Sequence, residues 1–165
     1  MSGSAAVHAQ VRADLERLGI PYEVIPCDPA FADTAQFCEK YGYPPQISGN
    51  TILVASRKEP KQFAACLVSA TTRLDVNNTV RKLLGVRKLS FASAEDTQEL
   101  TGMMIGGVTL FGLPEALPKY VDARIMDLES VIIGSGSRSS KIRMAPDDLL
   151  KIAQARVVEG LALDP

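Results

Sequence analysis

Two glycine-bearing segments are the places where this chain could build a site from its backbone. Residues 102–114, GMMIGGVTLFGLP, carry four glycines and no charged side chain. Residues 133–144, IGSGSRSSKIRM, combine two glycines and four serines with three cations, among them Arg138 and Lys141. Glycine allows unusual backbone conformations and close approach, and turns rich in it can present N–H groups to an oxygen-rich ligand. A buried bend before a core strand and a solvated hairpin explain these two patterns equally well.

The side chains that serve the commonest hydrolases and metalloenzymes are scarce. His8 is the single histidine, and it falls on the polar side of a predicted first helix, so a Ser-His or Cys-His pair is not expected. Cys27, Cys38 and Cys66 are odd in number and lack CxxC spacing, which predicts reduced core cysteines. Residues 133–144 also lack the GxxxxGK[ST] order of a P-loop. We predict no metal site and no cofactor.

Length, charge and hydropathy bound the class of protein. A chain of 165 residues fits a single domain spanning residues 1–165. The 18 basic residues face 19 acidic ones and the isoelectric point is about 5.9, so we expect no DNA binding, and any RNA contact has to be local or helped by a partner. No run reaches the roughly 18 apolar residues of a membrane span, and the N-terminal residues lack the apolar core of a signal peptide. These features predict a cytoplasmic protein without membrane contact.

Hydrophobic periodicity and turn residues predict the elements that must position the glycine-bearing segments. Helices are expected at residues 7–18, 33–41, 75–84, 93–101 and 147–154, the first three stopped by Gly19, Gly42 and Gly85. Asp33 with Gln36, and Ser93 with Asp96, have capping-box spacing. Strands are expected at residues 22–25, 51–56, 63–69, 88–91, 120–122, 130–134 and 141–144, with one more core strand after the glycine-rich bend.

The order of these elements indicates the fold class. The runs at residues 51–56 and 63–69 are joined by the charged, proline-containing stretch RKEPKQ, and they form the clearest hairpin of the chain. Helices and strands do not alternate regularly, as they would in a doubly wound sheet. We therefore predict an α+β fold, a single domain with a curved mixed β-sheet flanked by helices.

Several motifs, in this order along the chain, resemble a known family. TTRLDVNNTVRKLLG, LTGMMIGGVTLFG, the YVD segment and GSGSRSSKIRMAPDDL are similar to the YbaK/ProX family of aminoacyl-tRNA deacylases, related to the editing domain of bacterial prolyl-tRNA synthetase. The resemblance covers nearly the whole chain and implies a YbaK-like fold. It also implies hydrolysis of the ester that joins a wrong amino acid to the 3′ end of a tRNA, with an aminoacyl-tRNA synthetase as a second candidate partner.

Such an activity agrees with the scarcity of nucleophiles in the sequence. A hydrophobic pocket discriminates between small amino acids by only about 1 to 3 kcal/mol per methylene, which is why a second, hydrolytic selection step is useful. An ordered water can attack an ester held near its reactive geometry, while main-chain N–H groups bind the developing oxyanion. No histidine or cysteine is then required.

Two residues depart from the family pattern. Asn50 occupies the position at which the family usually has a functionally important lysine, and an amide donates hydrogen bonds without supplying charge. Leu110 replaces a proline of the glycine-bearing loop. Lys58, Lys61, Arg73 and Lys141 are the cations that could take over the missing charge, although each is also explained as a solvated surface residue.

These considerations define a candidate site. We predict that the reaction centre is lined by Asn50, Thr51, Gly106, Gly107, Gly136 and Ser137, and that the substrate is bound by Tyr22, Met103, Thr109, Arg138 and Lys141. The alternative is a catalytically silent member of the family that binds an aminoacyl-tRNA end or a synthetase. A structural interaction protein without a pocket is the third interpretation.

Overall fold

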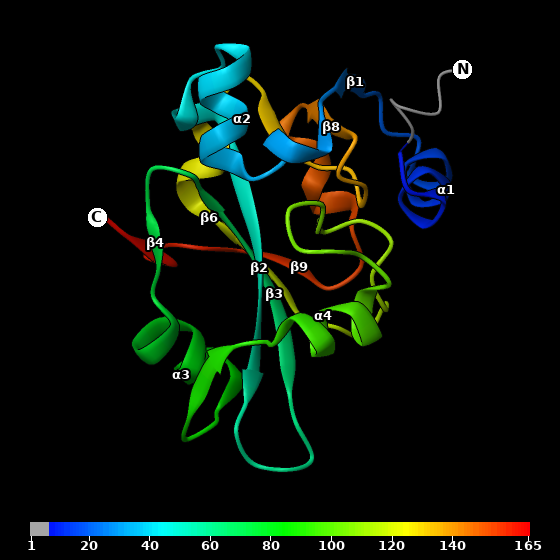
Figure 1. Cartoon of the computed structure of the whole chain (residues 1–165). Coiled ribbons are helices and arrows are strands. Elements are labelled where there is room, and N and C mark those ends of the chain that lie inside the picture. Colours follow the sequence, from blue (N-terminus) through cyan, green and yellow to red (C-terminus); the bar gives the residue numbers. More distant parts are fainter. Residues whose placement is uncertain (1–6) are drawn as a thin grey trace.

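A computed structural model describes residues 7–165 of the chain (Figure 1). Residues 1–6 belong to the stretch in which we predict no signal peptide, and they lie outside the described residues. The described residues form an α+β fold, as predicted. Their strands divide between a five-stranded mixed sheet and two smaller antiparallel sheets.

The five-stranded sheet contains the predicted hairpin. Strands β2 (Gly49–Ser56) and β3 (Phe63–Ser69) pair antiparallel, with Leu53 opposite Ala65. Strand β5 (Leu89–Phe91) pairs antiparallel with the other edge of β2, while β6 (Lys119–Asp122) and β9 (Ala155–Val158) continue the sheet in parallel beyond β3. The sheet is therefore mixed, in the order β5-β2-β3-β6-β9, with β3 at its centre.

The two smaller sheets flank this one. Strands β1 (Glu23–Pro26), β8 (Ser140–Met144) and β7 (Val131–Gly134) form an antiparallel sheet in the order β1-β8-β7. Short strands β4 (Arg73–Leu74) and β10 (Ala162–Leu163) pair with each other. A bridge between Ser48 and Ile132 places β7 beside the start of β2. The second glycine-bearing segment is thus the β7–β8 hairpin, next to β2.

Short helices surround the sheets. The α-helices are α1 (Ala9–Leu18), α2 (Thr34–Tyr41), α3 (Arg81–Leu84) and α4 (Ala94–Thr101), and α3 is preceded by a π-helical turn, η4 (Val76–Val80). Single 3₁₀ turns are η2 (Pro29–Phe31), η3 (Pro45–Ile47), η5 (Ala123–Asp127) and η6 (Pro146–Lys151). The predicted helix stops at Gly19, Gly42 and Gly85 are confirmed, because each has a left-handed backbone conformation at a helix C-terminus.

Three local predictions fail. Residues 147–154 do not form an α-helix, because the chain leaves the 3₁₀ turn η6 at Ile152 and continues as β9, where β-branched valines suit a strand. Residues 109–111 are buried, but the stretch 108–111 is not a strand. Asp33 precedes α2 without capping it, because its carboxylate instead accepts a hydrogen bond from Arg138. Ser93 does cap α4, through the N–H of Asp96.

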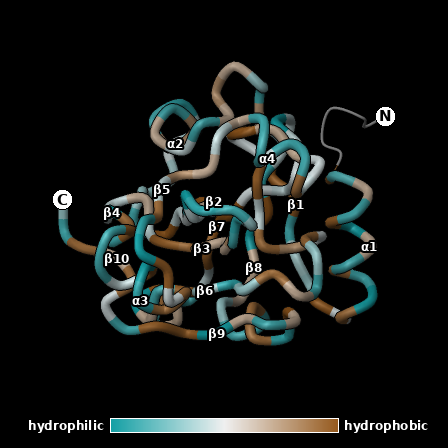
Figure 2. The backbone as a smooth tube through the Cα atoms, turned by 90° about the horizontal axis from the view of Figure 1, so that it is seen from below, coloured by the Kyte–Doolittle hydropathy of each residue, from teal (hydrophilic) through white to brown (hydrophobic). Residues whose placement is uncertain are grey.

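The alternation of side chains along the strands divides the core between the two faces of the main sheet. Leu53, Leu67 and Val121 face a cluster that contains apolar residues of α1, of the β7–β8 hairpin and of the stretch 103–117. Val54 and Cys66 face a second cluster with η4, α3 and the β4–β10 pair. In Figure 2 the central strands are largely apolar, while α1 and α3 at the rim carry hydrophilic stretches.

Candidate functional site

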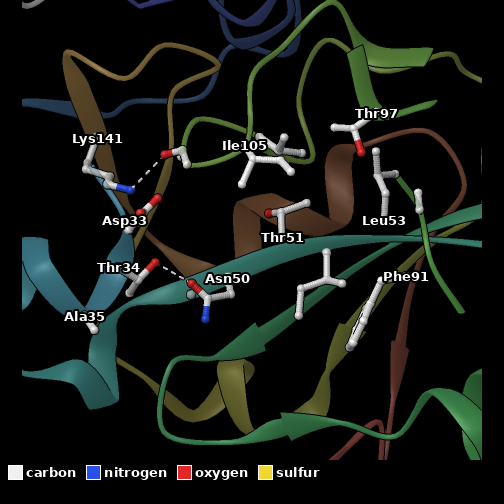
Figure 3. Close-up of a pocket in the computed structure, with 16 residues that line it drawn as sticks. Asp33, Thr34, Ala35, Asn50, Thr51, Leu53, Phe91, Thr97, Ile105 and Lys141 are labelled. Carbon is white, nitrogen blue, oxygen red and sulfur yellow. Dashed lines mark hydrogen bonds between the residues drawn. The ribbon is translucent and has the colours of Figure 1, made fainter. Parts of the chain in front are cut away.

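A cavity of about 440 Å³ lies over the first half of β2 (Figure 3). Its floor is β2, from Gly49 to Leu53, and one wall is the start of α2. The first glycine-bearing segment contributes Ile105 and Gly106, and β8 contributes Lys141. Elements distant in sequence therefore converge on one concave surface of the size that small ligands occupy.

The two glycine-bearing segments pack directly against each other beside this cavity. The N–H of Gly136 donates to the carbonyl oxygen of Gly107 at 2.6 Å. A Cβ atom on Gly134 would lie 2.4 Å from the carbonyl oxygen of Val108, so only glycine allows this approach. Both segments also contribute to the cavity lining, the first with Ile105, Gly106 and Val108 and the second with Gly134 and Lys141.

The main-chain amides of Gly107 and Gly136 are nevertheless engaged within the protein. The N–H of Gly107 donates to the carbonyl oxygen of Met104 at 2.9 Å, and that of Gly136 is paired with Gly107 as described above. Neither residue lines the cavity. Gly107 and Gly136 therefore hold the wall together, and they do not present the oxyanion-binding donors that we expected from them.

Lys141 is the cation of the cavity. Its side chain rises from β8 and is buried, with 5% of its surface exposed. The ammonium donates to the carbonyl oxygen of Gly106 at 3.2 Å and lies 5.6 Å from the centre of the Phe37 ring. Burial lowers the pKa of Lys141, and the nearby Cys27 and Asp33 oppose this shift. A desolvated ammonium interacts with a developing anion more strongly than a solvated one.

Asn50 and Thr51 lie on the cavity floor, and their place at a reaction centre stays a prediction. The side-chain oxygen of Asn50 accepts a hydrogen bond from the hydroxyl of Thr34, which fixes the amide at the start of β2. The hydroxyl of Thr51 is buried and has no hydrogen-bond partner among residues 7–165. A polar group left unpaired in a cavity is suited to a ligand, because burial without a partner costs about 1 to 3 kcal/mol.

Arg138 has a different place from the one we expected. Its guanidinium donates to the carboxylate of Asp33 at 3.2 Å, to the carbonyl oxygen of Ile105 at 2.6 Å and to that of Pro29 at 2.9 Å. It therefore ties the β7–β8 hairpin to the first glycine-bearing segment and to the loop before α2. Arg138 does not line the cavity, and its donors are used within the protein. Gly106 has φ +95°, and a Cβ there would collide with this guanidinium.

Four more predicted residues lie outside the cavity lining. The Ser137 hydroxyl is hydrogen-bonded to the Ser139 hydroxyl at 2.8 Å and stabilises its own turn. Met103 is fully buried in the larger core cluster, and Tyr22 packs on that cluster from its edge. Thr109 is fully buried, with its hydroxyl unpaired among residues 7–165. These side chains support the walls of the cavity without facing its interior.

Sequence reasoning missed several residues that line the cavity. Asp33 and Thr34 were interpreted only as a helix start, although both line the cavity and the Thr34 hydroxyl donates to the side-chain oxygen of Asn50. Phe91 lines the cavity from β5 and is 63% exposed. An aromatic residue at the end of a predicted strand was the one available indication of this contact.

Other chemistry has little support near the cavity. The ring nitrogen Nδ1 of His8 accepts the N–H of Gln10 and caps α1. Burial raises the pKa of Cys66 to about 12, so this thiol stays protonated at neutral pH. Residues 7–165 hold no cluster of three or more potential metal-ligating side chains.

None of the helices in the same part of the chain is long and apolar enough to span a membrane.

This arrangement of fold and cavity belongs to a known family. Residues 28–152 match the model of the aminoacyl-tRNA editing domain, and the chain is a member of that family. The family resemblance of the sequence motifs is thereby confirmed.

Two curated relatives and two solved structures illustrate the relationship. EbsC of Enterococcus faecalis, provisionally assigned as a Cys-tRNA(Pro)/Cys-tRNA(Cys) deacylase, is 23% identical over 93 residues, 56% of each chain. The uncharacterized protein YwhH of Bacillus subtilis is 30% identical over 101 residues, 61% of this chain and 63% of YwhH. The matched part thus spans less than two thirds of either relative.

The solved structures extend over more of the chain. The crystal structure of a provisionally assigned trans-editing enzyme for prolyl-tRNA synthetase has a TM-score of 0.79 at 25% identity, covering 100% of this chain and 99% of that one. The hypothetical protein APE2540 has a TM-score of 0.82 at 21% identity, covering 93% and 99%. The α+β fold is therefore shared with this provisionally assigned trans-editing enzyme and with APE2540.

Proposed function

We propose that this chain, residues 1–165, is an aminoacyl-tRNA deacylase that removes a small noncognate amino acid from the 3′ end of a tRNA. The observation that carries the proposal is the cavity that joins the buried ammonium of Lys141 to the polar floor formed by Asn50 and Thr51. Membership of the editing-domain family and likeness to a trans-editing structure support it.

The size and lining of the cavity agree with this substrate class. About 440 Å³ is enough for a small amino acid and its ribose, at the lower end of the range for ligand sites. Leu53, Ile105 and Val108 supply apolar surface next to the polar floor. Such a wall selects by size, because a larger side chain would have to displace packed residues.

The side chains, more than the backbone, would carry the chemistry. A water held by the Thr51 hydroxyl attacks the ester carbonyl carbon, and the resulting oxyanion is stabilised by the Lys141 ammonium and the Asn50 amide. The attacking water gives up a proton to solvent, the bond between that carbon and the ribose oxygen then breaks, and the ribose oxygen takes a proton from solvent. The products are the free amino acid and the deacylated tRNA.

Lys141 also supplies the positive charge that the family lysine would have provided at position 50. Asn50 removes a charge from the start of β2, while Lys141 brings one into the same cavity from β8. We infer that the cation has moved between strands and that this chain is an active enzyme. Its partners are then aminoacyl-tRNA and, as a further proposal, an aminoacyl-tRNA synthetase in the cytoplasm.

Hydrolysis of a panel of mischarged tRNAs tests the proposal. The expected result is release of free amino acid from at least one small noncognate aminoacyl-tRNA well above the rate in buffer, and loss of that release in Lys141→Met. Arg143→Met is the matched control, because Arg143 lies on the same strand and bonds to Ser130 away from the cavity. Buffer-level release across the whole panel would contradict catalysis, and tRNA binding without release would favour the silent alternative.

A further inference from the structure

The far end of the β2–β3 hairpin gathers much of the positive charge of the molecule. Two segments meet there, residues 57–62 between the strands and residues 81–88 in and after α3. They hold seven of the 18 lysines and arginines but only one acidic residue, Glu59. We call the seven the hairpin-end cluster: Arg57, Lys58, Lys61, Arg81, Lys82, Arg87 and Lys88. In a chain of net charge −1, this is a strong local asymmetry.

The two segments form one concave surface. The N–H of Arg57 donates to the carbonyl oxygen of Lys88 at 3.2 Å, which fixes the hairpin connection beside the loop after α3. Arg57, Lys58, Arg87 and Lys88 line a cavity of about 700 Å³, and three of them also line an adjoining cavity of about 580 Å³ with Arg81. Figure 1 shows the hairpin tip and α3 together at one end of the molecule.

Most of these cations have no acidic partner within the protein. Among residues 7–165, Lys61 is the one member of the cluster in an ion pair, with Asp96 at 3.1 Å. The Arg81 guanidinium donates to the carbonyl oxygens of Asn77 and Val86. The remaining five are exposed and unpaired in the described part of the chain. Crowded like charges repel each other, so a polyanion that neutralises them would bind favourably.

Strand β2 links this cluster to the candidate site. Arg57 follows Asn50 by seven residues, which corresponds to about 23 Å of strand. Strand β5 runs beside this half of β2 and carries Phe91, opposite Val54. The Phe91 ring lines the site cavity and is 63% exposed, and Figure 3 places it on the side away from Lys141. An exposed ring between a cavity and a cationic surface is suited to stack an unpaired base.

We propose that the hairpin-end cluster binds the phosphate backbone of a tRNA acceptor stem while the unpaired 3′ end passes Phe91 into the cavity. The proposal rests on the proposed function for the identity of the RNA. Charge supplies the affinity, the aromatic ring supplies a stacking platform, and β2 sets the distance between them. An acidic protein would match the charge, whereas an RNA with an unpaired end matches the charge, the exposed ring and the adjoining cavity together.

Binding of deacylated tRNA tests this surface independently of any hydrolysis. Fluorescence anisotropy of labelled tRNA compares the wild type with Arg87→Ala/Lys88→Ala, and with the control Arg12→Ala/Arg156→Ala, which removes two exposed cations from other elements. The cluster variant should bind about tenfold more weakly or worse, while the control stays within about twofold. The slope of log K against log[salt] should fall in magnitude by about 1.4 to 1.8 in the cluster variant, because two phosphate contacts are lost.

Two further measurements sharpen the result. Phe91→Ala should weaken binding of a short single-stranded RNA ending in CCA, with little change for a blunt RNA duplex. Hydrolysis of aminoacyl-adenosine, which has no stem, should be unchanged in Arg87→Ala/Lys88→Ala. If the cluster variant binds tRNA with wild-type affinity, the proposal that this surface binds tRNA is wrong, even if the chain is a deacylase. Displacement of tRNA by poly-glutamate at equal charge concentration would overturn it in favour of an acidic protein partner.

Discussion

The two ends of strand β2 use charge in opposite ways. At the cavity end, one buried ammonium is held by a carbonyl oxygen and an aromatic ring, with the carboxylate of Asp33 as the acidic group of the same cavity. At the hairpin end, five exposed cations lack acidic partners among the described residues. The first arrangement is desolvated, and the second is exposed to solvent.

This difference suggests a division of labour. A preorganised charge in a desolvated pocket stabilises a transition state strongly, because it needs no reorganisation when charge develops. Exposed cations contribute affinity for a phosphate backbone, and that affinity is screened by salt. Loss of charge at the cavity end should therefore slow the chemical step, whereas loss at the hairpin end should weaken binding.

The largest effect is expected from Lys141→Met. The variant keeps the length and apolar packing of the side chain but removes the ammonium, so the rate of deacylation should fall about 100-fold to 1,000-fold, as when an oxyanion-hole donor is lost. Single-turnover release of amino acid from a mischarged tRNA measures it. Arg143→Met, on the same strand, should keep a rate near that of the wild type.

Gly134→Ala should damage the wall between the glycine-bearing segments. Its Cβ would lie 2.4 Å from the carbonyl oxygen of Val108, so the segments must separate, at a cost of about 1 to 3 kcal/mol in the free energy of unfolding. Deacylation should fall about tenfold or more. Gly42→Ala is the control: it has a positive φ but open space around its Cβ, so it should lower stability without lowering the rate. Equal deacylation rates in Gly134→Ala and Gly42→Ala would show that the packing of the two glycine-bearing segments is unimportant for catalysis.

The pH dependence of the reaction should report the buried ammonium. Burial lowers the pKa of Lys141 from its ordinary value of 10.5, so the charged form is lost at a lower pH than for a solvated lysine. After subtraction of spontaneous ester hydrolysis, the rate should fall by about tenfold per pH unit above that pKa. In Lys141→Arg the fall should disappear from this range, because arginine stays protonated. Identical profiles for the two proteins would refute a catalytic charge at this position.

A smaller effect is expected from Asn50→Lys. The substitution restores the family residue but breaks the hydrogen bond to Thr34 and places a second cation in the cavity of Lys141. Like charges disfavour each other, so deacylation should fall about threefold to tenfold, as measured by single-turnover kinetics. A faster rate would mean that Lys141 does not replace the family lysine.

Local sequence patterns correctly predicted the features that depend on interactions between residues close in sequence, namely helix ends and a hairpin. The helix stops at Gly19, Gly42 and Gly85 follow from the left-handed conformation that glycine tolerates, and the β2–β3 hairpin follows from two apolar runs around a charged turn. The C-terminal segment was mispredicted because Leu149 and Ile152 fit a helical period and an irregular buried chain equally well. Only contact with β6 determines that a strand follows.

The candidate site was predicted in part for the same reason. Asn50, Thr51, Gly106 and Lys141 were identified from motifs and lie on one cavity. The roles of Arg138 and Gly136 depend on partners that are distant in sequence. The Arg138 guanidinium donates to a carboxylate and to two carbonyl oxygens, and the Gly136 N–H donates to one carbonyl oxygen. Sequence spacing contains no information on such partners, so their donors were wrongly assigned to a ligand.

The concentration dependence of single-turnover deacylation tests the division of labour most directly. Lys141→Met and Arg87→Ala/Lys88→Ala are compared with the wild type on one mischarged tRNA, from enzyme concentrations below the dissociation constant to far above it. The cluster variant should reach the wild-type rate once tRNA is saturated, whereas Lys141→Met should remain slow at every concentration. A cluster variant that stays slow at saturation, or a Lys141 variant that recovers, would contradict this account.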